Sequence, residues 1–224
     1  MKITWLGQAG LLFETDNKKI VIDPYFSDSC KKLNPLSYRR VEVEKSVLEI
    51  QPDIVICTHN HQDHYDEESL DFFLKTEKSV LCIVPPSCFT PIRKYGKHHN
   101  YVYFPKNTEW TEGNIKFTAV KALHSDPEAI GIIIEAENKV YYITGDTLYN
   151  TEIFEALPEK IDVLFMPVNG VGNNMNFIDA SRFADKVNAK KVVPMHLGML
   201  DDRSVTDFKH ERAVYPEIYK EIKL

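Results

Sequence analysis

The sequence predicts an α/β protein built as a four-layer αββα sandwich, in which two sheet-rich halves are flanked by helices. Short apolar segments rich in Val and Ile recur through both halves, as buried strands do. Each half also contains a helical segment with a recognisable capping signal. No low-complexity segment or linker separates the halves. We therefore expect one domain over residues 1–224.

The first half alternates strands with short helices. Asp66 is placed to cap a helix that runs to Leu74, and acidic residues follow it in the first turn. Ser87 is expected to cap a second short helix reaching Gly96, in which Pro91 is tolerated only in the early turns. The strands of this half are expected at Lys2–Leu6, Leu11–Glu14, Lys19–Ile22, Ile54–Thr58 and Leu81–Val84.

The second half repeats the theme. The residues Asn176–Asp179 resemble a capping box that opens a helix to Asn188, and Glu137–Lys139 predicts a hairpin turn. The tail Asp201–Leu224 is expected to form a closing helix or strand on one half, although Pro216 excludes one uninterrupted helix. The strands are expected at Ile115–Leu123, Gly131–Glu137, Val140–Thr144, Val163–Val168 and Lys191–Met195.

Composition excludes several classes of protein. The 224 residues suffice for one sizeable core, and a hydrophobic content of 43% with 27% charged residues is typical of a soluble globular chain. The net charge of −6 argues against an extended nucleic-acid partner. No apolar run approaches the roughly 20 residues that span a bilayer, so we expect no membrane partner. The oligomeric state stays open, and a homo-oligomer is one alternative.

The cysteines and the N-terminus favour a cytoplasmic location. None of the four cysteines belongs to a C-x-x-C pair, and Cys57 and Cys82 lie in apolar runs where a buried free thiol is the ordinary state. Such thiols fit a reducing compartment. The segment Met1–Gly7 is typical of a strand and lacks the long apolar stretch of a signal peptide.

A dense cluster of metal-ligand side chains follows the apolar run Ile54–Cys57. His59, His61, Asp63 and His64 lie within six residues. Imidazole suits zinc, iron and other first-row metals, and carboxylate suits harder cations. In extended backbone His59 and His61 point the same way, because they are two residues apart. The cluster therefore predicts several ligands delivered to one point.

Three further candidate ligands lie at the ends of predicted strands. They are His124, Asp146 and His196. A single histidine in such a place means little, but three strand-end ligands together with the first cluster provide enough donors for two metal ions. The order His-x-His-x-Asp-His, then His, Asp and His resembles the signature of the metallo-β-lactamase superfamily. The sequence matches every ligand position of that pattern.

Within this superfamily the chain resembles the L-ascorbate-6-phosphate lactonase-like branch of metal-dependent hydrolases. The resemblance is carried by Trp5–Gly10, Thr58–Asp66, Gly145–Tyr149 and Asn188–His196. It departs from the lactonase in its shorter length and after His196, where Leu197 replaces a second histidine. The flavodi-iron branch typically has glutamate where this chain has His61, which favours hydrolysis over oxygen reduction.

The ligand order implies two divalent ions, with manganese suggested by the lactonase resemblance, zinc by the histidine-rich set, and iron as an alternative. One site is expected at His59, His61 and His124, and the other at Asp63, His64 and His196. Asp146 is placed to bridge the two ions, and we assign Asp63 and Asp146 as catalytic. In the superfamily an aspartate at the place of Asp23 hydrogen-bonds a ligand histidine, and Thr58 is a candidate for the same supporting role.

The expected reaction is attack by a metal-bound hydroxide on a small anionic lactone or phosphate ester. A phosphodiesterase or nuclease-type hydrolase is an alternative, and so is a binding or sensing protein that keeps the metals without turnover. Tyr65 and Asn169 follow strand-end loops and are candidate substrate contacts. Arg93 belongs to a basic segment that would hold an anionic group of the substrate.

Overall fold

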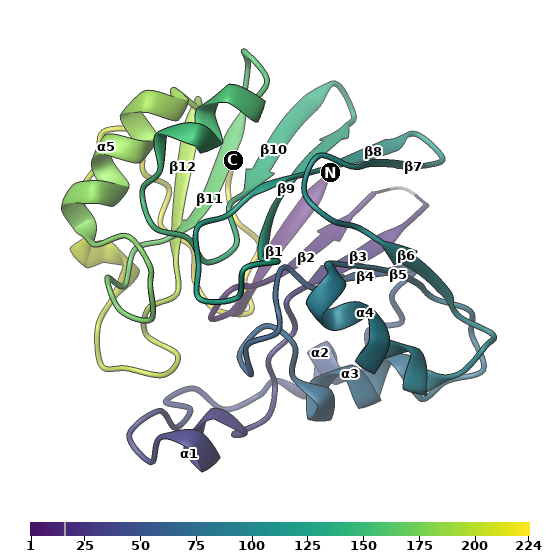
Figure 1. The fold of residues 1–224 in the computed structure, drawn as a ribbon. Helices are drawn as coiled ribbons and strands as arrows, with labels where there is room; N and C mark the ends of the chain where they lie inside the picture. The colour runs from purple at the N-terminus through teal and green to yellow at the C-terminus, as the bar shows by residue number, and fades with distance from the viewer. Residues whose placement is uncertain (16) are drawn as a thin grey trace.

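Two mixed β-sheets form the centre of the molecule in a computed structural model that describes residues 1–15 and 17–224 (Figure 1). In the first sheet the order is β1-β2-β3-β4-β5-β6, antiparallel from β1 to β3 and parallel from β3 to β6. Its strands are β1 (Lys2–Gly7), β2 (Gly10–Glu14), β3 (Lys19–Ile22), β4 (Ile54–Ile56), β5 (Leu81–Val84) and β6 (Asn100–Tyr103).

The second sheet has the order β12-β11-β10-β9-β8-β7. It is antiparallel from β7 to β10, and β10, β11 and β12 run parallel. Its strands are β7 (Glu109–Glu112), β8 (Ile115–Lys121), β9 (Ile130–Ala136), β10 (Lys139–Ile143), β11 (Val163–Pro167) and β12 (Lys191–Met195).

Helices cover the outer face of each sheet. Figure 1 shows α3 and α4 against the first sheet and α5 against the second. The predicted four-layer αββα order is therefore confirmed, and none of the described helices is long and apolar enough to span a membrane. The helices are α1 (Cys30–Leu33), α2 (Lys45–Leu48), α3 (Glu67–Leu74), α4 (Pro86–Ile92) and α5 (Phe177–Val187), with 3-10 turns η1 (Arg93–Tyr95), η2 (Thr151–Ala156) and η3 (Val205–Asp207).

The alternation of strand side chains builds two apolar layers. Ile20 and Ile22 of β3 belong to the large cluster that contains both sheets, whereas Val21 between them belongs to the cluster under α3 and α4. The rings of Phe13 and Phe165 meet edge to face across the inner layer, with centroids 5.7 Å apart. This packing fixes how the strand ends of one sheet face those of the other.

The start of α4 differs from the prediction. Pro85 precedes the helix as its N-cap and Pro86 is the first helical residue, so Ser87 lies inside the first turn instead of capping it. A proline at the first helical position is favoured because its φ is already helical and its missing N–H would have had no partner. The Ser87 hydroxyl instead donates a hydrogen bond of 2.6 Å to Asp126.

Two strands were not predicted from the sequence. β6 and β7 are the edge strands on one side of the two sheets, and most of their side chains are exposed or half-buried. Edge strands of this kind carry polar residues on both faces and lack the alternation that marks a half-buried strand. These two strands form because they pair with β5 and β8. Such pairing with a distant segment leaves no local pattern in the sequence.

The tail Asp201–Leu224 spans both sheets, so the expectation of a closing helix or strand on one half was wrong. Beyond η3, the tail forms isolated bridges in place of a longer regular element. Ala213 pairs with Val192 at the β12 edge, and further on the Tyr219 N–H donates to the Trp5 carbonyl of β1 at 2.7 Å. The tail thus covers the two edge strands that lie opposite β6 and β7.

Gly7 lies where the β1–β2 turn meets the loop after β12. Its φ is +92°, and an added Cβ would lie 1.8 Å from Cε of Met199. We predict that Gly7→Ala lowers the free energy of unfolding by about 2–3 kcal/mol, because the strain of a positive φ adds to the smaller cost of displacing the flexible end of the buried Met199 side chain. Denaturant unfolding measures the loss.

Gly113→Ala is the matched control for this prediction. Gly113 also has a positive φ, +60°, but an added Cβ there has no neighbour within 4 Å. It should cost only the backbone strain, about 1–2 kcal/mol. Equal losses in the two variants would show that the contact with Met199 does not matter.

Candidate metal centre

The candidate ligands gather where strands of both sheets end in the same direction. In the second sheet β8, β10 and β12 point one way, because β8 and β10 are each antiparallel to β9 and β12 runs parallel to β10 through β11. His124, Asp146 and His196 follow these three strands. In the first sheet β1, β3 and β4 likewise share a direction. The loops after them bring Gln8, Asp23 and the cluster that begins at His59.

Three groups of ligand atoms lie close enough to share cations. His59, His61 and His124 form one group, and Asp63, His64 and His196 form another. A middle group joins His59, His64 and Asp146, so the two outer groups are contiguous. In each group the ligand atoms lie within 4.8 Å of one another. The arrangement matches the two sets expected from the sequence, with Asp146 between them.

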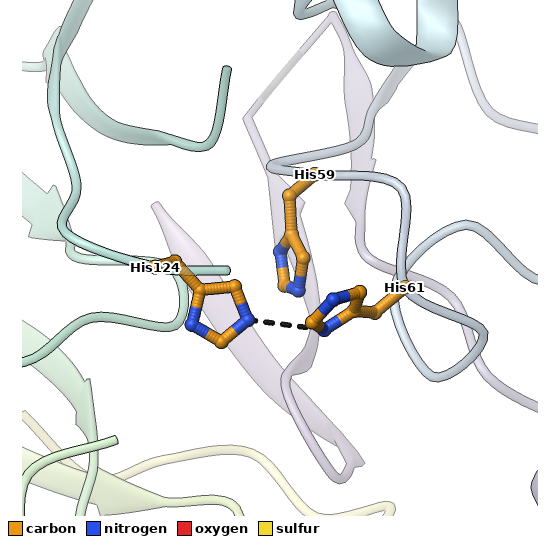
Figure 2. A group of neighbouring side chains, drawn as sticks. All are labelled: His59, His61 and His124. Carbon is orange, nitrogen blue, oxygen red and sulfur yellow. Dashed lines mark hydrogen bonds between the residues drawn. The ribbon is translucent and has the colours of Figure 1, made fainter. Parts of the chain in front are cut away.

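Figure 2 shows the first group, in which the three imidazoles of His59, His61 and His124 point toward one another from two different loops. Nε2 of His124 lies 3.0 Å from Nδ1 of His61. The ring of His59 is 4.6 Å, centroid to centroid, from each of the other two. Three nitrogen donors around one point are the arrangement that zinc and similar metals accept.

A buried carboxylate fixes the tautomers of two candidate ligands. Asp23 accepts hydrogen bonds from the Thr58 N–H at 2.7 Å, from the Thr58 hydroxyl at 2.6 Å and from Nδ1 of His64 at 2.8 Å. Because a carboxylate only accepts, His64 carries its proton on Nδ1. The Thr58 hydroxyl donates its one hydrogen bond to Asp23, so toward Nδ1 of His59, 3.1 Å away, it acts as the acceptor. When the rings are neutral, Nε2 is therefore the nitrogen of each that can bind a metal ion.

Two buried polar atoms test whether the site fits a cation. Among the described residues, Nε2 of His59 and Oδ1 of Asp146 are buried and have no hydrogen-bond partner, although Nε2 of His64 lies 3.3 Å from the Asp146 oxygen. A buried acceptor without a partner is costly. Both atoms belong to the middle group of ligands. Each has a lone pair that can bind a divalent metal ion. The residues therefore fit a metal ion.

The electrostatics of the site point the same way. Burial, with the neighbouring His64, holds the pKa of His59 well below its usual range. Burial also opposes a charge on His196, but the carboxylates of Asp146 and Asp63 outweigh it and raise its pKa to about 10. Burial would raise the pKa of Asp146, yet the imidazoles of His196 and His64 hold it well below normal. The carboxylates thus collect positive charge, and a divalent ion supplies that charge in place of protons.

The backbone around the site is strained at several residues. Gln8, Asp23 and His196 have φ values of 48°, 45° and 70°, a region that residues other than glycine seldom occupy. Such strain concentrates where the surrounding structure holds a side chain in one required direction. Gly145, just before Asp146, has φ +59°, and an added Cβ would lie 2.7 Å from the Ile130 carbonyl oxygen. Only glycine lets this turn pass so close beneath the metal-ligand loop.

Three amide side chains hold ligands of the second and middle groups. Nε2 of Gln8 donates to Asp63 at 2.8 Å and lies 3.0 Å from Nδ1 of His196. The amide of Asn169 also lies 3.0 Å from Nδ1 of His196. Nδ2 of Asn174 donates to Oδ2 of Asp146 at 2.7 Å. These contacts leave the ligand side chains little freedom to turn.

A cavity of about 410 Å³ opens above the ligands. Its floor includes His61, Asp63, Asp146 and His196, and Asn169 lies on its wall. This volume is in the range of small-molecule sites. Asn169 is therefore a candidate substrate contact that also supports His196.

The other two expected substrate contacts are not among the described residues that line this cavity. The side chain of Tyr65 is buried in the apolar cluster under α3 and α4, and burial raises the pKa of its phenol. Arg93 lies in η1, with its guanidinium 5.5 Å from the Phe89 ring centroid. A residue that follows a metal-ligand loop can still turn into the core, as Tyr65 does. Arg93 lies at the far end of α4 from the first turn of that helix.

Comparison with known proteins identifies the family. Residues 2–196 match the family model described as the beta-lactamase superfamily domain. The chain belongs to the metallo-β-lactamase superfamily. The match spans every candidate ligand from His59 to His196, and the tail Asp201–Leu224 lies beyond it.

Relatives and solved structures agree with the fold. The chain is 29% identical to a protein of Ligilactobacillus salivarius named a UPF0173 metal-dependent hydrolase, over 93% of this chain and 91% of the relative. Igni18, a metallo hydrolase from Ignicoccus hospitalis, superimposes with a TM-score of 0.77 at 21% identity, over 99% of this chain and 97% of that one. YhfI from Bacillus subtilis, described as a metallo-beta-lactamase fold protein, gives 0.72 at 18% identity, over 99% of both chains.

Within this metallo-β-lactamase site, sequence reasoning missed three supporting residues. Gln8 and Asn174 carry no pattern of their own, although the flanking Gly7-Gln8-Ala9-Gly10 turn is a usable signal for the first. Asp126 is a buried carboxylate that accepts from the Asn60 N–H at 3.1 Å and from the Ser87 hydroxyl. Its position two residues after His124 was the available signal, because a carboxylate near a ligand often anchors a neighbouring loop.

We predict that Asp23→Asn weakens zinc binding about 10–100-fold, because an amide cannot accept from both Thr58 and His64 and the tautomers are no longer fixed. Competition with a chromophoric chelator measures the affinity, and thermal unfolding checks that the variant folds. Asp53→Asn is the matched control, since Asp53 accepts from the Lys19 N–H where β3 begins, at the opposite end from Asp23. Unchanged affinity in Asp23→Asn would remove this residue from the support of the ligands.

Proposed function

We propose that this protein is a metal-dependent hydrolase that acts on a small lactone or phosphate ester and holds two divalent cations, manganese or zinc, with iron as the alternative. The carrying observation is the middle group of His59, His64 and Asp146, which joins the two outer ligand groups. Cations held in adjacent groups of this kind can act together on one substrate. The names of the curated relatives as metal-dependent hydrolases support the proposal.

The proposed ligands are His59, His61, Asp63, His64, His124, Asp146 and His196. When bound, the ions would lower the pKa of water toward neutrality and polarise the bond to be broken. The chain itself orients the ligands through Asp23 and Gln8. The Asp63 carboxylate lines the cavity, and we propose that it takes up the proton that water loses.

The products follow from the bonds that change. Water adds its oxygen to the carbonyl carbon of a lactone, the ring C–O bond breaks, and the ring oxygen gains a proton, which gives a hydroxy acid. With a phosphate ester, water attacks phosphorus and the alcohol leaves. Water is the nucleophile in both cases, so no side chain forms a covalent intermediate.

The alternatives receive less support. A nuclease-type phosphodiesterase needs cationic phosphate contacts along its partner, and the chain carries a net charge of −6. A binding or sensing protein without turnover would also use the cavity, but the names of the relatives as metal-dependent hydrolases favour turnover.

We predict two bound transition-metal ions per chain. Elemental analysis of protein incubated with zinc or manganese and then dialysed should give two equivalents, and His124→Ala should retain about one. His98→Ala is the control, because His98 contacts the Thr76 carbonyl away from the ligand groups. A wild-type protein that stays metal-free under these conditions would contradict the proposed function.

We predict that Asp146→Ala lowers hydrolysis by at least about a hundredfold, since a direct ligand matters more than the supporting residues that change activity 10–100-fold. The measurement is kcat/KM on the best substrate from a panel of lactones and bis(p-nitrophenyl) phosphate, with circular dichroism to confirm folding. Asp179→Ala, on the exposed side of α5, is the control and should keep full activity. Full activity in Asp146→Ala would exclude its role between the two ions.

A further inference from the structure

Away from the candidate metal ligands, the described part of the cavity wall carries no positive side chain. None of the described residues that line it is Lys or Arg, and Asp201 is the one charged side chain there outside the ligand set. Asp201 lies in the loop after the last ligand, and one of its oxygens, Oδ1, accepts from the N–H groups of Gly198 and Arg203. An anionic group of a substrate that sits away from the metal ligands would therefore face a carboxylate and no cation.

Two arginines hold the backbone of residues that line the cavity, Arg40 at Leu200 and Arg203 at Asn169. Nη1 of Arg40 donates to the carbonyls of Leu36, Tyr38 and Leu200, at 2.6 to 2.8 Å. Nη1 of Arg203 donates to the Asn169 carbonyl at 2.6 Å. These guanidinium groups hold the loops around the cavity in shape, and their hydrogen bonds to backbone oxygens occupy donors that a phosphate or carboxylate would need.

The mouth of the cavity carries apolar side chains beside the polar Asn34 and Ser37. Leu33 at the end of α1 and Val171 in the loop after β11 line it, and they are 76% and 60% exposed. Leu200 completes this rim from the loop that follows the last ligand. When a ligand covers apolar side chains that were exposed to water, the burial of their surface favours binding.

We infer that the substrate is uncharged away from its reacting group and carries an alkyl or similarly apolar substituent, which lies against Leu33, Val171 and Leu200. This inference rests on the proposed function and names the substrate class of the same site. It favours an alkyl-substituted lactone or ester over a phosphorylated sugar derivative. It also replaces the expectation of an anionic substrate held by Arg93, because that side chain is not among the described residues lining the cavity.

The test compares two metal-binding probes that differ only at the far end. Hexanohydroxamic acid and adipic monohydroxamic acid share the chelating group and chain length, but the first ends in a methyl and the second in a carboxylate. Calorimetric titration of the zinc-loaded protein should show the methyl-ended probe binding at least about tenfold more tightly. Within the alkyl series from acetohydroxamic acid upward, each methylene should add about two- to fourfold until the chain leaves the rim.

Variants at the rim identify the residues responsible. Leu33→Lys should narrow the preference for the methyl-ended probe by at least about threefold, since it removes apolar contact and supplies a cation. Leu36→Lys is the matched control: it makes the same change in the same segment at 75% exposure but is not among the described residues that line the cavity. It should leave the preference unchanged. The measured quantity is the affinity of each probe for the zinc-loaded protein, which does not depend on turnover.

The outcomes separate this inference from the proposed function. A wild-type protein that binds the carboxylate-ended probe as tightly as the other, or that binds neither, overturns the inference. Equal effects of Leu33→Lys and Leu36→Lys overturn it as well. If the methyl-ended probe is preferred but no lactone or ester is hydrolysed, the ligand class stands and the proposed function fails. If the protein hydrolyses phosphate esters and prefers the carboxylate-ended probe, the proposed function stands and the inference of an apolar substituent fails.

Discussion

The buried carboxylate of Asp23 is the interaction on which the rest of the site depends. It receives the Thr58 N–H, the Thr58 hydroxyl and Nδ1 of His64, and so ties the end of β3 to the loop after β4. A charged group with so little access to water is tolerated only when its oxygens are filled with hydrogen bonds. Because Asp23 only accepts, the direction of every proton around it is determined, and two imidazoles are left with Nε2 free. A single residue thus decides which nitrogen atoms of His59 and His64 face the metal site.

Both sheets contribute ligands to the site. The loop after β4 in the first sheet carries four of the candidate ligands, and the ends of β8, β10 and β12 in the second sheet carry the other three. A backbone hydrogen bond of 3.0 Å from the Ile130 N–H to the Thr58 carbonyl joins the sheets directly beside the ligands. Glycine at position 145 allows the turn of Asp146 to pass beneath that bond. The apolar layer between the sheets therefore sets the distances on which metal binding depends.

The sequence predicted the ligand cluster and most inner strands because both leave a local trace. His59, His61, Asp63 and His64 are close in the chain, and buried strands show unbroken apolar runs. β6 and β7 were missed because edge strands need no apolar face, and Gln8 and Asn174 because an amide acquires its role only from what lies across from it. Tyr65 was placed in the pocket because it follows the ligand cluster, and Arg93 because it belongs to a basic segment, yet a core contact and a helix direct their side chains elsewhere. The metallo-β-lactamase superfamily was identified correctly, whereas nothing singles out its lactonase-like branch. What is local in the chain was predictable, and what depends on long-range packing was not.

The tail gives this division between sheets a further meaning. By pairing with β12 through Ala213 and with β1 through Tyr219, it links the strands that lead to His196 and to Gln8. A cation held by ligands from both sheets would be a second link between the sheets, at the ends of those same strands. Two such links between the same bodies are thermodynamically coupled, since each one lowers the entropy that the other must remove. The affinity of the site for its ions then depends on how stably the two sheets pack against each other. A substitution in the tail, remote from every ligand, would therefore change that affinity.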